Sequence, residues 1–171
     1  QENIDTFLPL VEGGSNELQE WICLIQAYSF AENYDAAWKW VQKAEAKFPE
    51  SAILHIYAGD LLRSMKRYDE AFPHWKRALE MEPEWCDAAF SMGFCYEEMG
   101  EYEKARTCFE NSSIHDMEVR YMLGIIYTQG LGVEKNIGKG IKYLKSANGI
   151  PEAQLEIAKY KKPFLGKWVR K

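Results

Sequence analysis

Apolar residues recur at helical spacing along most of the chain, and the pattern is clearest between Ala52 and Pro83. Within this stretch, two runs of apolar or small residues are separated by a polar break. They are Tyr57, Ala58, Leu61, Leu62 and Met65, followed by Ala71, Trp75, Ala78 and Leu79. Such a stripe predicts two amphipathic helices joined by a short turn. Because one helical hairpin of this size cannot bury its own apolar stripe, we expect it to pack against further copies.

Copies of the pattern are present, and they recur every 34 residues, as from position 34 to 68 to 102. The residues that share this interval are aromatic or small: Tyr34, Tyr68 and Tyr102; Ala37, Ala71 and Ala105; and Ala44, Ala78 and Ser112. Pro49 and Pro83 mark the ends of two of these units. A fixed period, here the step from Tyr34 to Tyr68 to Tyr102, predicts stacked helix pairs rather than a single compact bundle.

The first unit, read from Leu18, shows which residue types occupy which positions. Its unit positions 4, 7, 11, 20, 27 and 32 hold Trp21, Leu24, Tyr28, Ala37, Ala44 and Pro49. This order resembles the tetratricopeptide repeat. The resemblance implies an all-α fold, namely a right-handed α-solenoid of antiparallel helix pairs. One departure is at unit position 8, where Gly59 and Gly93 are small as expected but the first unit has Ile25.

The spacing changes in the fourth unit. The small residues of its two helices, Gly124 and Gly140, are further apart in the sequence than their counterparts Gly59 and Ala71, so the turn between the helices is longer. The stretch from Leu123 to Ala147 is similar to the Sel-one-like repeat, a relative of the tetratricopeptide repeat. It departs from that pattern at Asn136 in place of Asp, Gly140 in place of Ala, and Leu144 in place of an aromatic residue, with Tyr143 beside it.

These patterns predict four parts of the chain. Residues 1–15 form a linker or the remnant of an earlier helix, because their apolar segment is interrupted by Pro9 and stopped by two glycines. Residues 16–117 form three tetratricopeptide repeats, and residues 118–162 form a Sel-one-like repeat with a half repeat or capping helix that reaches about Lys161. Residues 163–171 form a basic tail.

Composition agrees with a globular chain. Apolar residues make up 47% and charged residues 27% of the 171 residues, without the bias of a disordered chain. No run approaches the roughly 18 consecutive apolar residues that a membrane helix needs. The four cysteines stand in helical pattern without metal-ligand spacing, which favours buried thiols and a cytoplasmic protein; they are Cys23, Cys86, Cys95 and Cys108.

Motifs for chemistry are weak. The stretch from Gly132 to Gly140 has five residues between its glycines instead of the four of a phosphate loop, and a glycine where a magnesium-binding hydroxyl belongs. His55, His74 and His115 have no second ligand at metal-binding spacing. We therefore expect no enzyme activity, no cofactor and no metal.

The resemblance to tetratricopeptide repeats instead implies a binding surface. In that family the first helix of each pair lines a concave groove. The matching residues that we predict to contact a partner are Ile22, Gln26, Ile56, Asp60, Arg63, Phe90, Phe94, Glu97, Tyr121 and Ile125. Apolar side chains with acids nearby favour a protein or peptide that has apolar anchors and basic flanks. An alternative is that some of the apolar residues only pack between helices.

Family members that hold the C-terminal carboxylate of heat-shock chaperones use lysine, arginine and asparagine side chains. The matching positions here are Ile22, Gln26, Tyr57, Asp87 and Ser91. Because none of them is a cation and Asp87 has the wrong sign, we do not expect docking of chaperone tails in that mode.

Charge is placed unevenly. The segment from Lys159 to Lys171 carries six basic residues and no acid, which leaves −11 for the rest of a chain whose formal net charge is −5. The tail can cap the solenoid, anchor the chain to a membrane or nucleic acid, or bind the acidic groove; we favour the cap. The sequence thus predicts a protein-binding scaffold, adaptor or chaperone-like module. The alternatives are a regulatory domain of a larger enzyme, suggested by the start at Gln1, and a nucleic-acid-associated factor that uses the tail.

Overall fold

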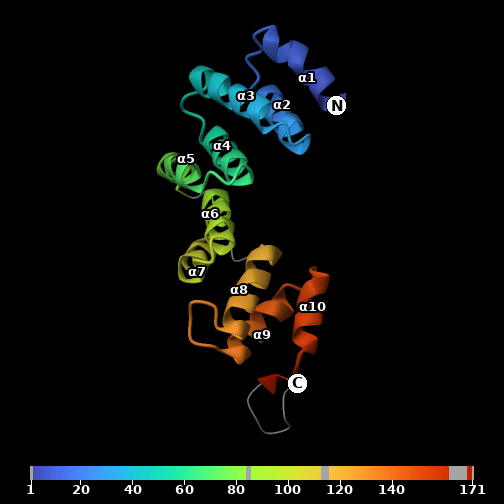
Figure 1. Cartoon of the computed structure of the whole chain (residues 1–171), viewed down its shortest axis with the longest axis vertical. Coiled ribbons are helices and arrows are strands. Elements are labelled where there is room, and N and C mark those ends of the chain that lie inside the picture. The colour runs from blue at the N-terminus through green and yellow to red at the C-terminus, as the bar shows by residue number, and fades with distance from the viewer. Residues whose placement is uncertain (1, 84–85, 113–115, 162–168, 171) are drawn as a thin grey trace. The chain divides into compact units, whose positions relative to one another are not determined.

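A computed structural model of the chain describes residues 2–83, 86–112, 116–161 and 169–170, which contain ten helices and two short strands (Figure 1). The chain divides into two compact units, Gln1–Ser91 and Met92–Lys171. No helix of the described residues is both long and apolar enough to cross a bilayer.

The first unit is built of helices that pack with their neighbours in the sequence. They are α1 (Glu2–Glu12), α2 (Leu18–Phe30), α3 (Tyr34–Lys47), α4 (Ala52–Ser64), α5 (Tyr68–Met81) and the first part of α6 (Cys86–Glu98). Helix α2 packs on α3, α4 packs on α5, and α3 also contacts α4. The two helix pairs predicted from the repeat period are therefore present.

Helix α1 occupies the region for which a linker or a helix remnant was predicted. It runs through Pro9 and ends before Gly13, whose N–H donates to the Pro9 carbonyl oxygen at 2.9 Å. Ile4 and Val11 are buried in the same cluster as Trp21 and other core residues of α2. The first residues thus contribute an additional helix to the core instead of an extended linker.

The turns within the first three helix pairs end their first helices in the same way. Glu32, Lys66 and Gly100 occupy equivalent positions of successive repeats and have φ angles of 56°, 60° and 75°. In each turn the residue after them donates its N–H to the carbonyl oxygen of the last helical turn, as from Arg67 to Leu62 at 2.8 Å. This is the Schellman motif, which favours glycine at the left-handed position. Two of the three positions therefore hold a residue type that is strained there.

Replacing Glu32 by glycine is expected to raise the free energy of unfolding by about 0.5–1 kcal/mol. A side chain in the left-handed region costs about 1–2 kcal/mol, part of which is offset by the greater freedom of glycine in the unfolded chain. The measurement is urea denaturation followed by circular dichroism, with Glu32→Ala as the matched control that keeps Cβ. Equal stability of the glycine and alanine variants would contradict the strain argument.

The close contact within each pair is made by a glycine facing a large side chain. A Cβ atom on Gly59 would lie 2.4 Å from Nε1 of Trp75, and one on Gly93 would lie 2.6 Å from Cε1 of Phe109. In the first pair, where Ile25 replaces the glycine, the position equivalent to Trp75 holds the smaller Val41. Ile25 and Val41 are buried in one cluster. The larger side chain on α2 is matched by a smaller one on α3, so the interface between the two helices remains filled.

The second unit continues with helix pairs and ends in a small sheet. Its elements after α6 are α7 (Tyr102–Asn111), α8 (Met117–Gln129), α9 (Ile137–Ser146), α10 (Pro151–Ala158), β1 (Tyr160–Lys161) and β2 (Val169–Arg170). The strands are antiparallel, with Tyr160 opposite Arg170. The last helix ends at Ala158, before the predicted end near Lys161, and the strand pair was not predicted. Residues 163–168 and 171 of the expected tail, and residue 162 before it, lie outside the described residues.

The turn between α8 and α9 is a loop that glycines and an asparagine shape. Gly130 and Gly132 have φ angles of 77° and 61°, which favour glycine. Asn136 caps α9, because its side-chain oxygen accepts from the N–H of Lys139 at 2.9 Å. Asn136, one of the residues that depart from the Sel-one-like pattern, is therefore the N-cap of α9. The stretch compared with a phosphate loop is this turn and the helix after it.

Candidate peptide-binding surfaces

Three of the predicted groove residues meet in the first unit. Gln26 on α2 and Asp60 and Arg63 on α4 line a cavity of about 120 Å³. Ser29, Tyr57 and Ser64 complete its polar wall. The repeat positions therefore identified the helix faces that meet here, although the cavity is small and its lining is mixed, with Ile25 and Leu61 beside the polar residues.

Two predicted members of the apolar stripe are not exposed. Ile22 and Ile56 have exposed fractions of 2% and 7%, so they offer almost no surface to a ligand. Both pack between helices, which is the alternative expected from the sequence. Position within the repeat indicates the face of the first helix, but the neighbouring helix decides how much of that face remains open.

Asp60 is held by the fold. The indole N–H of Trp75 donates to its Oδ1 at 3.2 Å. Burial raises the pKa of the Asp60 carboxyl, against the opposing effects of hydrogen bonding to Ser91, the charge of Arg63 and the bond from Trp75. Asp60 is therefore an internal acceptor that orders α4 and α5, and a poor candidate for long-range attraction of a basic ligand.

The predicted residues of α6 fall in both units. Phe90 is half-buried in the first unit, whereas Phe94 and Glu97 are half-buried in the second. The ring of Phe94 lies edge-on to Phe109, with 5.1 Å between ring centroids and 76° between the planes. Phe94 is therefore partly a packing residue and partly available surface.

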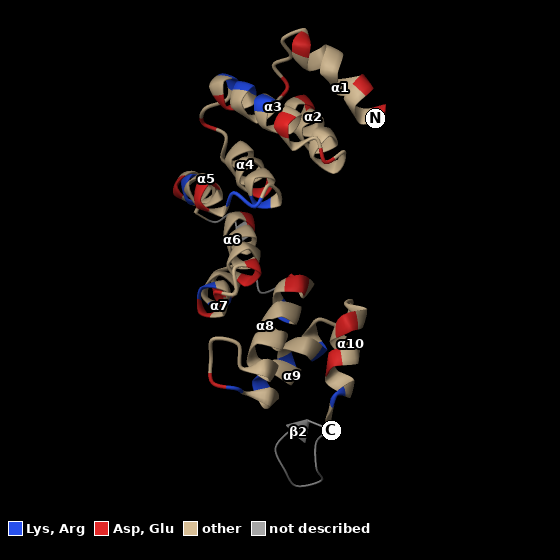
Figure 2. Ribbon diagram, viewed as in Figure 1, with Lys and Arg blue, Asp and Glu red and all other residues tan. Residues whose placement is uncertain are grey.

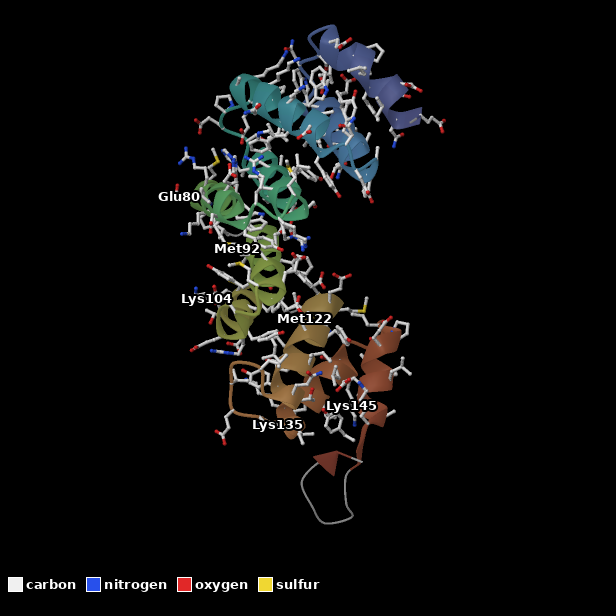
Figure 3. All side chains as sticks on the ribbon, in the orientation of Figure 1. Glu80, Met92, Lys104, Met122, Lys135 and Lys145 are labelled. Atoms are coloured by element: carbon white, nitrogen blue, oxygen red, sulfur yellow. The ribbon has the colours of Figure 1, made fainter. Side chains whose placement is uncertain are left out.

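The second unit contains a larger, mainly apolar pocket of about 370 Å³. It is lined by Phe94, Glu118, Tyr121, Met122, Gly149, Ile150, Pro151 and Glu152. Met122 is labelled on α8 in Figure 3, and acidic residues lie at the start of α8 and along α10 in Figure 2. Burial raises the pKa of the Tyr121 hydroxyl, and the nearby Glu156 and Glu152 add to the effect. The pocket combines apolar walls with two carboxylates at its edge.

Of the predicted residues of α8, the structure places one in this pocket. Tyr121 lines it together with Phe94. Ile125 instead packs against the buried cluster that contains Ile141 and Leu144. Met122 was not predicted, because it lies on α8 but not at one of the groove-facing positions of the repeat. Ile150 was not predicted, because it lies in the connection between α9 and α10, outside the first helix of a pair.

Comparison with known proteins identifies the repeat type. Residues 87–112 match the tetratricopeptide repeat family. The crystal structure of MamA is 21% identical, with a TM-score of 0.68, and the match covers 92% of this chain and 90% of that chain. The chain has the tetratricopeptide repeat fold. The predicted fold class, an all-α solenoid of antiparallel helix pairs, is thereby confirmed.

Two further matches agree. YrrB, described as "a TPR protein with an unusual peptide-binding site", is 20% identical with a TM-score of 0.64, over 91% of this chain and 81% of that chain. The curated Caenorhabditis elegans protein "Tetratricopeptide repeat-containing protein trd-1" is 21% identical, in an alignment covering 54% of this chain. That alignment spans 16% of the length of the trd-1 protein.

One group of possible metal ligands is present among the described residues of this tetratricopeptide fold. It consists of Glu45 on α3, His55 on α4 and His74 on α5. Burial lowers the pKa of His55, against the charge of Glu45. Sequence spacing did not predict this group, because its members come from three helices and meet only when the helices pack.

Proposed function

We propose that this chain is a protein–protein interaction module that binds a peptide segment in the apolar pocket of its second unit. The observation that carries the proposal is the pocket itself, with Phe94, Tyr121, Met122, Ile150 and Pro151 at its walls. Open apolar surface of this kind is typical of a binding site, because burial on a ligand removes it from water. The fold that the chain shares with YrrB supports the choice of a peptide ligand.

The proposed ligand has an apolar anchor flanked by lysine or arginine. Glu118 and Glu152 stand at the edge of the pocket and supply the complementary charge. Anchors in desolvated pockets supply most of the affinity, whereas charges at the rim mainly steer association. In this proposal the cavity with Gln26, Asp60 and Arg63, together with Phe90, forms a secondary contact region of the first unit. Glu97 and Ile125 from the predicted groove are additional contact residues of the second unit.

The module performs no chemistry in this proposal and acts as a scaffold, adaptor or chaperone-like component. Chaperone-tail docking is not proposed, because Asp87 and Ser91 replace the cations of that clamp. Binding to nucleic acid is not favoured for a chain whose net charge is −5. We keep the cytoplasm as the proposed compartment, since Cys23, Cys95 and Cys108 are free thiols.

The hairpin of α8 and α9 forms a Sel-one-like repeat in this proposal, and α10 begins a further one. Its support is the glycine-shaped loop and the close contact in which a Cβ on Gly124 would lie 2.6 Å from Cγ of Leu144. Leu144 therefore fills the space opposite Gly124.

The test of the proposed function is a binding titration with peptides selected from a random library on the immobilised chain. Selected peptides are expected to share an apolar anchor and basic flanks. Replacing Tyr121 and Met122 together by alanine is expected to weaken the binding of a labelled selected peptide about 30-fold, or about 2 kcal/mol. Anisotropy gives the dissociation constant, and circular dichroism verifies the fold.

Leu155→Ala is the matched control, since Leu155 is an apolar residue of α10 that is 68% exposed and does not line the pocket. Glu118→Gln with Glu152→Gln is expected to slow association mainly at low salt, because screening weakens attraction between exposed charges. Selection of acidic peptides, or unchanged binding by the Tyr121/Met122 variant, would overturn the proposal.

A further inference from the structure

We propose that Glu45, His55 and His74 form a binding site for a divalent transition-metal ion of the zinc class. Nδ1 of His55 and Nδ1 of His74 each lie 3.2 Å from the same carboxylate oxygen, Oε1 of Glu45. The two Nδ1 atoms are 3.3 Å apart. Three donor atoms from three helices thus form a nearly equilateral triangle.

The size of this triangle fits a tetrahedral ion. Zinc is bound by histidine nitrogen and carboxylate oxygen at about 2.0–2.2 Å, so that neighbouring ligand atoms around it are about 3.3–3.5 Å apart. The three observed separations of 3.2, 3.2 and 3.3 Å are close to one face of that tetrahedron. Two imidazoles and one carboxylate are also a donor set of zinc sites that leave the fourth position open.

The carboxylate oxygen of the triangle, Oε1 of Glu45, is buried without a hydrogen bond. Oε1 of Glu45 has no hydrogen-bond partner within the described part of the chain, although two imidazole nitrogens lie 3.2 Å away. A buried acceptor in this condition is unfavourable. A cation placed over the triangle would satisfy this oxygen and the two ring nitrogens together.

The surroundings of the triangle allow an ion to reach it, and they also orient the histidine rings. The side chains of His55, His74 and Glu45 are 18%, 22% and 24% exposed, so the cluster opens to solvent. The ring of His74 lies edge-on to Trp38, with 5.9 Å between centroids. Neighbouring charges partly compensate one another. The positive charge of Arg77 disfavours a second positive charge on His55, but Arg77 also pairs with Glu80 at 3.3 Å. The negative charge of Glu70 interacts with His74.

The three ligands come from two successive repeats, so a bound ion would affect the stability of the fold. Glu45 belongs to the second helix of the first pair, whereas His55 and His74 belong to the two helices of the second pair. A bound ion would therefore link two successive repeats of the first unit. Because it binds the folded chain and not the separated ligands, the unfolding temperature is expected to rise with zinc concentration.

The experiment is a zinc titration of the full chain after removal of metal with a chelator. Calorimetry is expected to show one zinc ion per chain, and a thermal scan is expected to show an unfolding midpoint that rises with added zinc. Glu45→Gln, His55→Gln and His74→Gln are each expected to weaken binding at least tenfold. Glu103→Gln on α7, in the second unit, and His115→Gln are controls expected to bind like the parent.

A second measurement does not depend on variants that fold. In nitrogen-15 spectra of the parent's histidines, zinc is expected to shift the Nδ1 resonances of two of the three. Absence of zinc binding in calorimetry, an unchanged histidine spectrum, or full binding by folded His55→Gln and His74→Gln variants would overturn the proposal. Equal loss of binding in His115→Gln would also overturn it.

Discussion

Replacing Trp75 by alanine is expected to lower the free energy of unfolding by about 3–5 kcal/mol, as is typical for a large aromatic residue removed from a core. Trp75 has an exposed fraction of 0% and fills the space opposite Gly59. Its ring also packs edge-on against Phe72, with 5.6 Å between centroids. Alanine would leave a cavity between α4 and α5 and remove the donor to Asp60.

Urea denaturation followed by circular dichroism measures this loss. Trp75→Phe is the informative second variant, because it keeps an aromatic ring and removes the N–H that Asp60 accepts, so it should be less destabilising than alanine. Phe30→Ala is the control for loss of an aromatic residue from the surface, since Phe30 is 86% exposed, and its effect should stay within about 0.5 kcal/mol. A loss below about 1 kcal/mol for Trp75→Ala would show that the pair does not depend on this contact.

The helix pairs could be predicted from the sequence because each depends on local pattern. Helical spacing of apolar residues and the constant repeat period identify helices, and the small residues at Gly59 and Gly93 identify where they approach. Other features depend on contacts across the fold. The larger Ile25 in place of glycine can be explained only when the smaller Val41 is known to face it. The pairing of Tyr160 with Arg170 cannot be predicted from a helical pattern.

The candidate sites were harder to predict, for the same reason. Repeat positions placed Gln26, Asp60 and Arg63 together, and placed Phe94 and Tyr121 on faces that meet in one pocket. They could not show that Ile22 and Ile56 are covered by neighbouring helices. Nor does spacing along one helix reveal the metal-ligand cluster, whose members are on three helices.

Replacing Gly140 by alanine is expected to lower the free energy of unfolding by about 3 kcal/mol, at the upper end of the range for overpacking. A Cβ atom there would lie 2.5 Å from Cγ2 of Thr128, 2.7 Å from the Thr128 backbone nitrogen and 2.8 Å from the Gly124 carbonyl oxygen. Backbone atoms cannot rotate away, so α8 and α9 would have to separate. The carbonyl oxygen of Gly124 also accepts from the Thr128 hydroxyl at 2.8 Å, which fixes that side chain in place.

Gly138→Ala supplies the matched control, because Gly138 is also in α9 and its added Cβ would meet Asn136 Oδ1 at 3.6 Å, an ordinary contact. Alanine favours a helix over glycine by about 1 kcal/mol, so this variant should be as stable as the parent or more stable. Opposite effects of one methyl group at two glycines of the same helix would separate close packing from helix propensity. They would also explain why Gly140 stands where the Sel-one-like pattern has alanine. If both variants gained stability in urea denaturation, the contact between α8 and α9 would be looser than the distances at Gly140 indicate.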